Sequence, residues 1–346
     1  MSIEKPHLPS FQSERVDHPK NSTFIQYPGQ GSQFVGMGEK LYHKFPTAKK
    51  KYDAADKILN YKISEISFFD RHNQLNKTEH TQPGIFVHSD VAGEIMEELG
   101  KEGFNPPSAF VVGHSLGEYN ALVKAGAFSF EDGLKLIDIR ARGMQEACDK
   151  EPGGMNSILG VTEEQVREVM DKIKGLEIAV INEGNSVVVG GSNTVLEKAT
   201  EEFGKMRRTK VMPLPVDGAF HTSLMQPAQE ALARALDNTN IKDTQIPVVA
   251  NTDTSILYTP ADIRYELLTQ LTTPVRWKDT ITFLKENGLT KGVEPGEKGI
   301  LSNIKKRAIG GTIASIAIGG VALGTAWFLH EHEAEKHKKD QEEDLK

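Results

Sequence analysis

The sequence predicts an α/β fold: a hydrolase-like core with a parallel sheet covered by helices, plus an inserted ferredoxin-like subdomain. Apolar, strand-like runs at 23–27 and 109–112 are separated by a mainly helical stretch from about 41 to 103, and this alternation favours a parallel sheet with helices on both faces. A β-α-β-β-α-β order of patterns over 153–216 is typical of a ferredoxin-like unit. With 346 residues, 38% of them hydrophobic, the chain can bury a large core.

The first strand, 23–27, runs into a glycine-rich loop, 28–33. Such loops often bind phosphate, but this one has neither the lysine of a Walker motif nor the full dinucleotide spacing, which disfavours nucleotide binding. The helical stretch that follows carries one apolar stripe, formed by Val87, Val91, Ile95 and Leu99.

The second strand, 109–112, leads into Gly113-His114-Ser115-Leu116-Gly117 and then into a helix expected over about 116–125, which Gly126 closes. Two glycines allow a tight strand-to-helix turn, from which the Ser115 hydroxyl projects beside free backbone N–H groups. Ser115 is therefore a candidate nucleophile. A plain glycine-serine turn is the alternative that the pattern leaves open.

The next helix starts at Ser129, a predicted N-cap followed by acidic residues. Arg140 lies three residues after Ile137 and four before Met144, close to the apolar face. We expect it to point inward, where it needs a carboxylate, a phosphate or carbonyl groups as partner. The alternative is an arginine that extends along the helix to solvent.

The inserted unit, 153–216, has its own regular pattern. Strands are expected near 155–159, 177–181, 186–190 and 210–214, with helices from a capping box at Thr162 to about 173 and over 194–203. Between the middle strands lies the polar loop Asn182–Ser186, which is either a loop that faces a cleft or a plain hairpin turn.

His221 ends the apolar, proline-marked segment 213–221, just before a helix-like run from Leu224. A histidine at such a junction can be held rigidly with one ring nitrogen free. If it meets Ser115 in space, the two form a nucleophile and its general base.

Composition excludes several classes. The formal net charge of -7 and the lack of zinc-finger spacing argue against a nucleic-acid binder and a metal site. Cys148 is the only cysteine, so a reducing, cytoplasmic setting is expected.

The two ends of the chain differ from its body. Residues 1–22 are polar and contain prolines, which predicts a flexible N-terminal arm. The run 308–329 has no charged residue and is long enough for a membrane-spanning helix of about 20 residues, although a glycine-rich packing helix is the alternative. The tail 330–346 is dense in both charges and is expected to be solvated.

Five motifs together resemble malonyl-CoA:acyl carrier protein transacylases. They occur in the family's order over about 23–307, and the extended elbow is most similar to free-standing acyltransferases of polyketide assembly lines. The motifs lie at 28–33, 113–119, 139–146, 218–221 and 274–277. The resemblance implies an acyltransferase core over 23–152 and 217–307, with the inserted unit as one wall of the cleft.

The resemblance also implies residue roles. Ser115 would attack the malonyl thioester while His221 takes its proton, and backbone carbonyls of the Gln270 region would orient the histidine. The backbone N–H groups of Gln30 and Leu116 would hold the oxyanion. No permanently bound cofactor is expected, because malonyl-CoA is a substrate and acyl carrier protein the acceptor.

Arg140 would grip the malonyl carboxylate, since a guanidinium fits a carboxylate in bidentate fashion. Phe220 matches the malonyl-type pattern, Asn182 matches the family's polar loop, and His114 is placed with them among the substrate-binding residues. Three features depart from the family: Ser186 stands where glutamine is usual, 294–299 replaces a Gly-Pro-Gly-Lys motif, and the C-terminal run is added.

A basic cluster is a candidate docking surface for the carrier protein or for coenzyme A phosphates, although a solvated charged edge is the alternative. It comprises Lys205, Arg207, Arg208 and Lys210. Two other functions remain open: an acyl hydrolase of the same fold, and a membrane-tethered inactive scaffold. An α/β-hydrolase triad is disfavoured, because no acidic residue between Ser115 and His221 stands out in a suitable loop.

Overall fold

The computed structural model describes residues 23–99 and 108–296. The predicted N-terminal arm 1–22, the candidate membrane or packing helix 308–329 and the charged tail 330–346 lie outside the described residues. Within the described ranges, no helix is both long enough and apolar enough to cross a membrane.

The core sheet has the strand order β8-β7-β2-β1-β9. Its strands are β1 (Thr23–Tyr27), β2 (Ser108–Gly113), β7 (Val248–Val249), β8 (Ile256–Leu257) and β9 (Gly292–Val293). All pairs are parallel except β7–β8, so the predicted parallel sheet is confirmed with one antiparallel edge. β7, β8 and β9 have two residues each, which is too short for a periodic pattern to reveal them.

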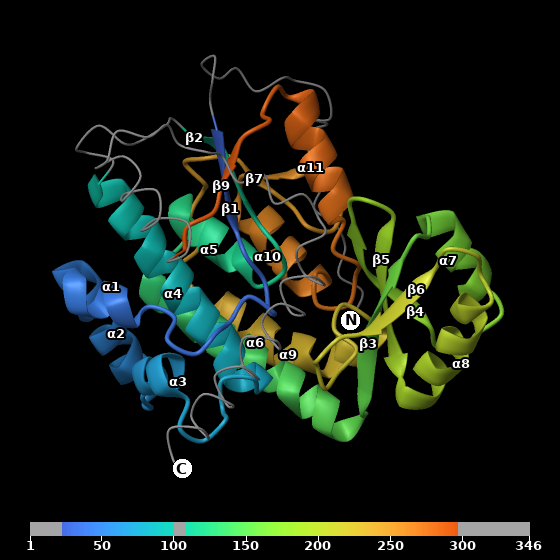
Figure 1. The fold of residues 1–346 in the computed structure, drawn as a ribbon. Helices are drawn as coiled ribbons and strands as arrows, with labels where there is room; N and C mark the ends of the chain where they lie inside the picture. Colours follow the sequence, from blue (N-terminus) through green and yellow to red (C-terminus); the bar gives the residue numbers. More distant parts are fainter. Residues whose placement is uncertain (1–22, 100–107, 297–346) are drawn as a thin grey trace, which may run out of the picture.

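Helices surround this sheet (Figure 1). They are α1 (Glu39–Lys44), α2 (Pro46–Leu59), α3 (Ile63–Phe69), α4 (Thr78–Leu99), α5 (Gly117–Lys124), α6 (Phe130–Lys150), α9 (Gln226–Asp237), α10 (Pro260–Thr269) and α11 (Trp277–Glu286). α5 packs on β1 and β2, while α6 packs between α4 and α9. In α4 the predicted stripe is confirmed, since Val87, Val91 and Ile95 are fully buried. Ser129 caps α6 by accepting a hydrogen bond from the Asp132 N–H, as its sequence predicts.

The inserted unit forms a second, antiparallel sheet of order β4-β5-β3-β6. Its elements are β3 (Gly153–Leu159), α7 (Glu163–Met170), β4 (Glu177–Asn182), β5 (Ser186–Ser192), α8 (Asn193–Gly204) and β6 (Lys210–Pro213). This connectivity and strand order are those of a ferredoxin-like unit. α7 and α8 cover one face of the sheet and enclose a separate small core (Figure 1). The Thr162 capping box is present, but α7 ends three residues earlier than predicted.

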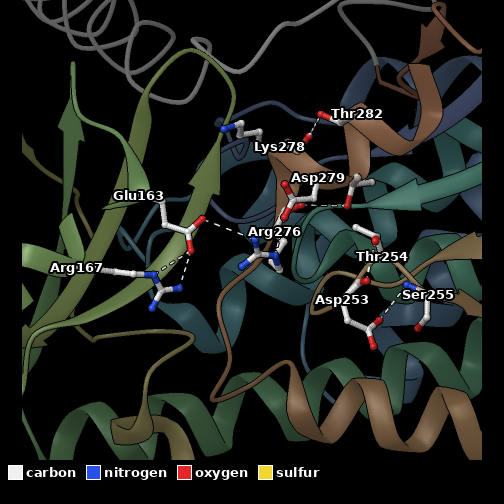
Figure 2. A network of polar contacts seen from close by, with 10 residues as sticks. Glu163, Arg167, Asp253, Thr254, Ser255, Arg276, Lys278, Asp279 and Thr282 are labelled. Carbon is white, nitrogen blue, oxygen red and sulfur yellow. Dashed lines mark hydrogen bonds and ion pairs between the residues drawn. The ribbon is translucent and has the colours of Figure 1, made fainter. Parts of the chain in front are cut away.

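One segment joins the two sheets. The Val275 N–H donates to the Ala179 carbonyl and the Val275 carbonyl accepts from the Ile181 N–H, which attaches the edge of β4 to the core. The next residue, Arg276, contacts Glu163 of α7 at 3.6 Å and Asp279 of α11 at 2.6 Å (Figure 2). The motif at 274–277 therefore connects the core to the small unit.

Candidate active site

Ser115 lies on the turn between β2 and α5, with a φ of 53°. The two flanking glycines are required by close backbone approach. A Cβ on Gly113 would lie 2.0 Å from the Gly117 carbonyl carbon, and a Cβ on Gly117 would lie 2.4 Å from the Tyr27 carbonyl oxygen. The turn is thus packed tightly against the end of β1, and it presents the serine at the carboxyl end of the core sheet.

The structure brings Ser115 and His221 together, 106 residues apart in sequence. Ser115 Oγ lies 2.7 Å from His221 Nε2, and His221 Nδ1 lies 2.7 Å from the Gln270 carbonyl oxygen. A carbonyl can only accept, so Nδ1 carries the ring proton and Nε2 is left to accept from the Ser115 hydroxyl. The histidine is oriented by a backbone carbonyl in place of a carboxylate, which removes the α/β-hydrolase triad as an alternative.

His221 is 4% exposed, and its environment favours the neutral ring. Burial, with a smaller contribution from the nearby Arg140 guanidinium, lowers the pKa of His221 to about 3. At neutral pH the imidazole therefore has a free lone pair on Nε2. This arrangement can remove a proton from the serine as it attacks an acyl carbon.

Arg140 points inward, as predicted, and is fully buried. Its Nη2 donates to Ser115 Oγ at 3.0 Å and to Gln270 Oε1 at 3.0 Å, while its Nη1 donates to Gln82 Oε1 at 2.6 Å. Its Nε is buried without a hydrogen-bond partner, and no carboxylate within 23–99 or 108–296 forms an ion pair with it. A buried cation with only neutral partners beside a nucleophile is suited to an anionic group of a substrate.

Gln82 links Arg140 to the glycine-rich loop. Its Nε2 donates to Gln30 Oε1 at 3.3 Å, and Gln30 Nε2 donates to Thr78 Oγ1 at 3.3 Å. The backbone N–H groups of Gln30 and Leu116 have no hydrogen-bond acceptor in the described part of the chain. Two unused N–H groups, one from each loop that meets at the serine, are the arrangement that an oxyanion hole requires.

Of the other predicted substrate-binding residues, Phe220 and Asn182 are buried and His114 is partly buried. His114 packs edge-on against Trp277 with ring centroids 5.4 Å apart, and burial lowers the pKa of His114 to about 4. Phe220 lies in the core beside His221, at 5% exposure. Asn182 ends β4 and pairs with Ser186 across the hairpin, and its Oδ1 is buried without a partner among the described residues.

The predicted basic cluster lies at the outer end of the small unit, around the link from α8 to β6. Lys205, Arg207, Arg208 and Lys210 are all exposed. Lys205 is paired with Glu202 at 2.5 Å. Exposure makes these side chains accessible to a partner, but their geometry does not bring them into contact with Ser115.

Comparison with known proteins places this site in a family. A family model described as the acyl transferase domain matches residues 23–307. The chain belongs to the acyl transferase domain family. It is 37% identical over 285 residues to a malonyl CoA-acyl carrier protein transacylase of Bacillus subtilis (strain 168), covering 81% of this chain and 88% of the relative. It is 35% identical to the polyketide biosynthesis malonyl CoA-acyl carrier protein transacylase PksC of the same organism, covering 81% and 95%.

Solved structures of this family are also similar. A malonyl CoA-acyl carrier protein transacylase from Coxiella burnetii superposes with a TM-score of 0.76 at 31% identity, covering 83% of this chain and 90% of that one. A malonyl-transacylase in complex with its type II polyketide acyl-carrier protein gives a TM-score of 0.76 at 31% identity, covering 88% and 97%. The expected resemblance to malonyl-CoA:acyl carrier protein transacylases is confirmed.

Several residues of this acyl transferase site were not predicted from the sequence. They are Gln82, which bonds to Arg140, Asn251, which bonds to Ser115, and Glu118 and Glu266, which both bond to Asn251. Asn251 could have been predicted from its position, because it is a polar residue just after the apolar pair Val248–Val249. Ligands in α/β sheets bind at the carboxyl ends of strands. For Gln82 the signal was a polar side chain inside an otherwise buried helix.

Proposed function

We propose that the protein is a malonyl-CoA:acyl carrier protein transacylase, serving fatty acid or polyketide biosynthesis. Ser115 attacks the malonyl thioester, His221 takes its proton, and coenzyme A leaves with that proton on its sulfur. The phosphopantetheine thiol of the carrier protein then attacks the malonyl ester, with His221 as the base, and Ser115 is regenerated. No resident cofactor or metal takes part in this sequence.

One observation supports malonyl as the acyl group. The buried Arg140 guanidinium donates to Ser115 Oγ, and its other acceptors are the side-chain amides of Gln82 and Gln270. A malonyl group on Ser115 would bring a free carboxylate to this cation as a direct ionic partner. Phe220, His114 and Asn182 belong to the same proposal as walls of the acyl pocket, and the N–H groups of Gln30 and Leu116 hold the oxyanion.

The test is to incubate the protein with malonyl-CoA and, separately, with acetyl-CoA, and to measure its intact mass. We expect a malonyl adduct that is absent in Ser115→Ala. In Arg140→Ala the preference for malonyl over acetyl should fall about 10- to 100-fold, because a charge-assisted pair of about 1.5 to 3 kcal/mol is lost. Free malonate without an adduct would favour the hydrolase, and no reaction at all would favour the inactive scaffold.

The second half-reaction tests the docking surface. Relatives with this fold are named for transfer to a carrier protein, and a structure of one such complex matches this chain. Lys205, Arg207, Arg208 and Lys210 form an exposed basic surface that suits an acidic partner. With Arg207→Glu and Arg208→Glu combined, transfer to carrier protein should slow about tenfold at low salt, while loading from malonyl-CoA stays the same. An unchanged transfer rate would leave the cluster as a solvated edge.

Attachment to a membrane through 308–329 remains a prediction from the sequence. The full chain and a chain ending at Arg307 would be expressed in parallel and separated into membrane and soluble fractions. Recovery of only the full chain with membranes is the expected result, and equal distribution of the two would refute the anchor.

A further inference from the structure

Asn251, just beyond the end of β7, bridges the whole nucleophile turn with one side chain. Its Oδ1 accepts from the Ser115 N–H at 2.7 Å, and its Nδ2 donates to the Gly113 carbonyl at 2.7 Å and to Glu118 Oε1 at 2.9 Å. It thereby holds the residue two before the serine, the serine itself and the first turn of α5. Asn251 is fully buried, and its bonds to Gly113 and Glu118 are shielded from water.

The turn needs such support. Ser115 has a φ of 53°, in the left-handed region, where a residue with a Cβ is disfavoured unless its surroundings fix it. β2 ends at Gly113 and α5 begins at Gly117, so the serine lies outside both regular elements. The Asn251 side chain supplies the acceptor for the Ser115 N–H that neither element provides.

Asn251 is itself held by two buried carboxyl groups. Its backbone N–H lies 2.9 Å from Glu118 Oε1 and 2.9 Å from Glu266 Oε1, and its carbonyl accepts from the Arg276 N–H at 2.8 Å. Glu266 also accepts from the backbone N–H of Thr252 at 3.1 Å and contacts its hydroxyl. The position of Asn251 is therefore fixed from β7, α5, α10 and the segment before α11.

Two carboxyl groups that share one donor inside the core cannot both be ionised. Burial raises the pKa of both Glu118 and Glu266 above the ordinary value, so the pair holds one proton between them near neutral pH. Glu118 accepts from N–H groups only: the backbone and side chain of Asn251, and Gln270 Nε2 at 2.6 Å. Glu266 faces a hydroxyl, that of Thr252, which can accept a hydrogen bond from a protonated carboxyl group as well as donate one. The donor set thus places the negative charge on Glu118 and the proton on Glu266.

We propose that Asn251 is a positioning residue for the nucleophile, and that the carboxylate of Glu118 holds it in place. Asn251 acts through the backbone of Ser115 and does not contact the acyl group. The inference rests on the proposed function only in taking Ser115 as the nucleophile.

The experiment measures the reactivity of Ser115 with a fluorophosphonate, which needs neither malonyl-CoA nor carrier protein. The rate of phosphonylation would be followed by intact mass in the full chain, with Ser115→Ala as the blank. In Asn251→Ala we expect a rate about 10- to 100-fold lower, since a shift of about 1 Å of a reacting atom has this effect. In malonyl loading, kcat should fall by the same factor with KM unchanged, because Asn251 makes no contact with Arg140.

Ser64→Ala is the matched control. It removes a buried hydroxyl that donates to Asp56 and has no part in the turn, so it should lower the thermal midpoint and leave the phosphonylation rate within about twofold. A rate in Asn251→Ala equal to that of this control would overturn the inference. A wild type that reacts with fluorophosphonate but takes no malonyl group would instead contradict the proposed function alone.

A second pair of variants decides the matter if Asn251→Ala does not fold. Glu118→Gln puts an NH2 group against N–H donors, whereas Glu266→Gln can donate its NH2 to the Thr252 hydroxyl. We expect Glu118→Gln to lower the phosphonylation rate at least about tenfold more than Glu266→Gln. Equal effects, or a larger effect of Glu266→Gln, would contradict the assignment of the carboxylate and the positioning role with it.

Discussion

At the scale of single residues, Gln270 forms hydrogen bonds with four other residues of the site. Its carbonyl orients His221, its Oε1 accepts from Arg140, and its Nε2 donates to the Ser115 carbonyl and to Glu118. A neutral amide therefore lies between the buried cation and the buried carboxylate. This separation keeps Glu118 from pairing directly with Arg140, and it leaves the guanidinium for a substrate carboxylate.

Changing this amide to a carboxylate should destroy the preference for malonyl. In Gln270→Glu, Arg140 gains an internal counter-ion, so the ratio of malonyl to acetyl loading should fall about 10- to 100-fold. Gln270→Met is the neutral control of similar size, and it should lower both loading rates while largely keeping their ratio. The measurement is kcat/KM for malonyl-CoA divided by kcat/KM for acetyl-CoA. The same ratio in Gln270→Glu and Gln270→Met would contradict the role of Gln270 as a neutral spacer between Arg140 and Glu118.

At the scale of elements, the site depends on how closely α5 approaches β1. Gly117 opens α5 directly over the Tyr27 carbonyl, and the His114 N–H donates to that same carbonyl at 3.0 Å. The helix start, the strand end and the nucleophile are thus one packed unit. A side chain at 117 has no space to occupy, because the nearest atoms belong to the backbone and cannot move independently.

Gly117→Ala should lower the free energy of unfolding by about 1 to 3 kcal/mol through this overlap. It should also reduce malonyl loading, since the turn must shift. Gly204, in the last turn of α8, has no described atom within 4 Å of an added Cβ. Gly204→Ala should therefore be neutral or stabilise by about 0.5 to 1 kcal/mol. Urea unfolding of the two variants measures the free energy of unfolding of each. Similar free energies for Gly117→Ala and Gly204→Ala would contradict the close approach of α5 to β1 at residue 117.

At the scale of the whole molecule, burial keeps His88, His114 and His221 neutral. Burial lowers the pKa of His88 and of His114 to about 4, and burial with Arg140 lowers that of His221 to about 3. The unfolded chain binds a proton at each of them near pH 6.5, whereas the folded chain does not. Above about pH 6.5 these histidines are neutral in both states and do not change the free energy of unfolding. As the pH falls from 6.5 toward 4, proton binding by the unfolded chain lowers the free energy of unfolding.

His88 has no hydrogen bond to Ser115, His221 or Arg140 in the described part of the chain, so it isolates this effect. In His88→Gln, the free energy of unfolding should depend less on pH between about 4 and 6.5, with a slope lower by about 1.4 kcal/mol per pH unit than in the wild type. Urea titrations at several pH values give the slopes, and parallel curves for wild type and His88→Gln would contradict the neutral, buried ring.

The sequence by itself determined the fold class, the ferredoxin-like insertion, the inward arginine and the pair Ser115 and His221. These follow from local patterns: a glycine-bounded turn, an amphipathic helix, a capping box, and motifs shared with a family. Only the tertiary structure decided which distant side chains complete the site. Asn251 reaches Ser115 across 136 residues, and Gln270 reaches Glu118 across 152. Such contacts arise where the carboxyl ends of parallel strands meet, and no periodicity along the chain records which strands become neighbours.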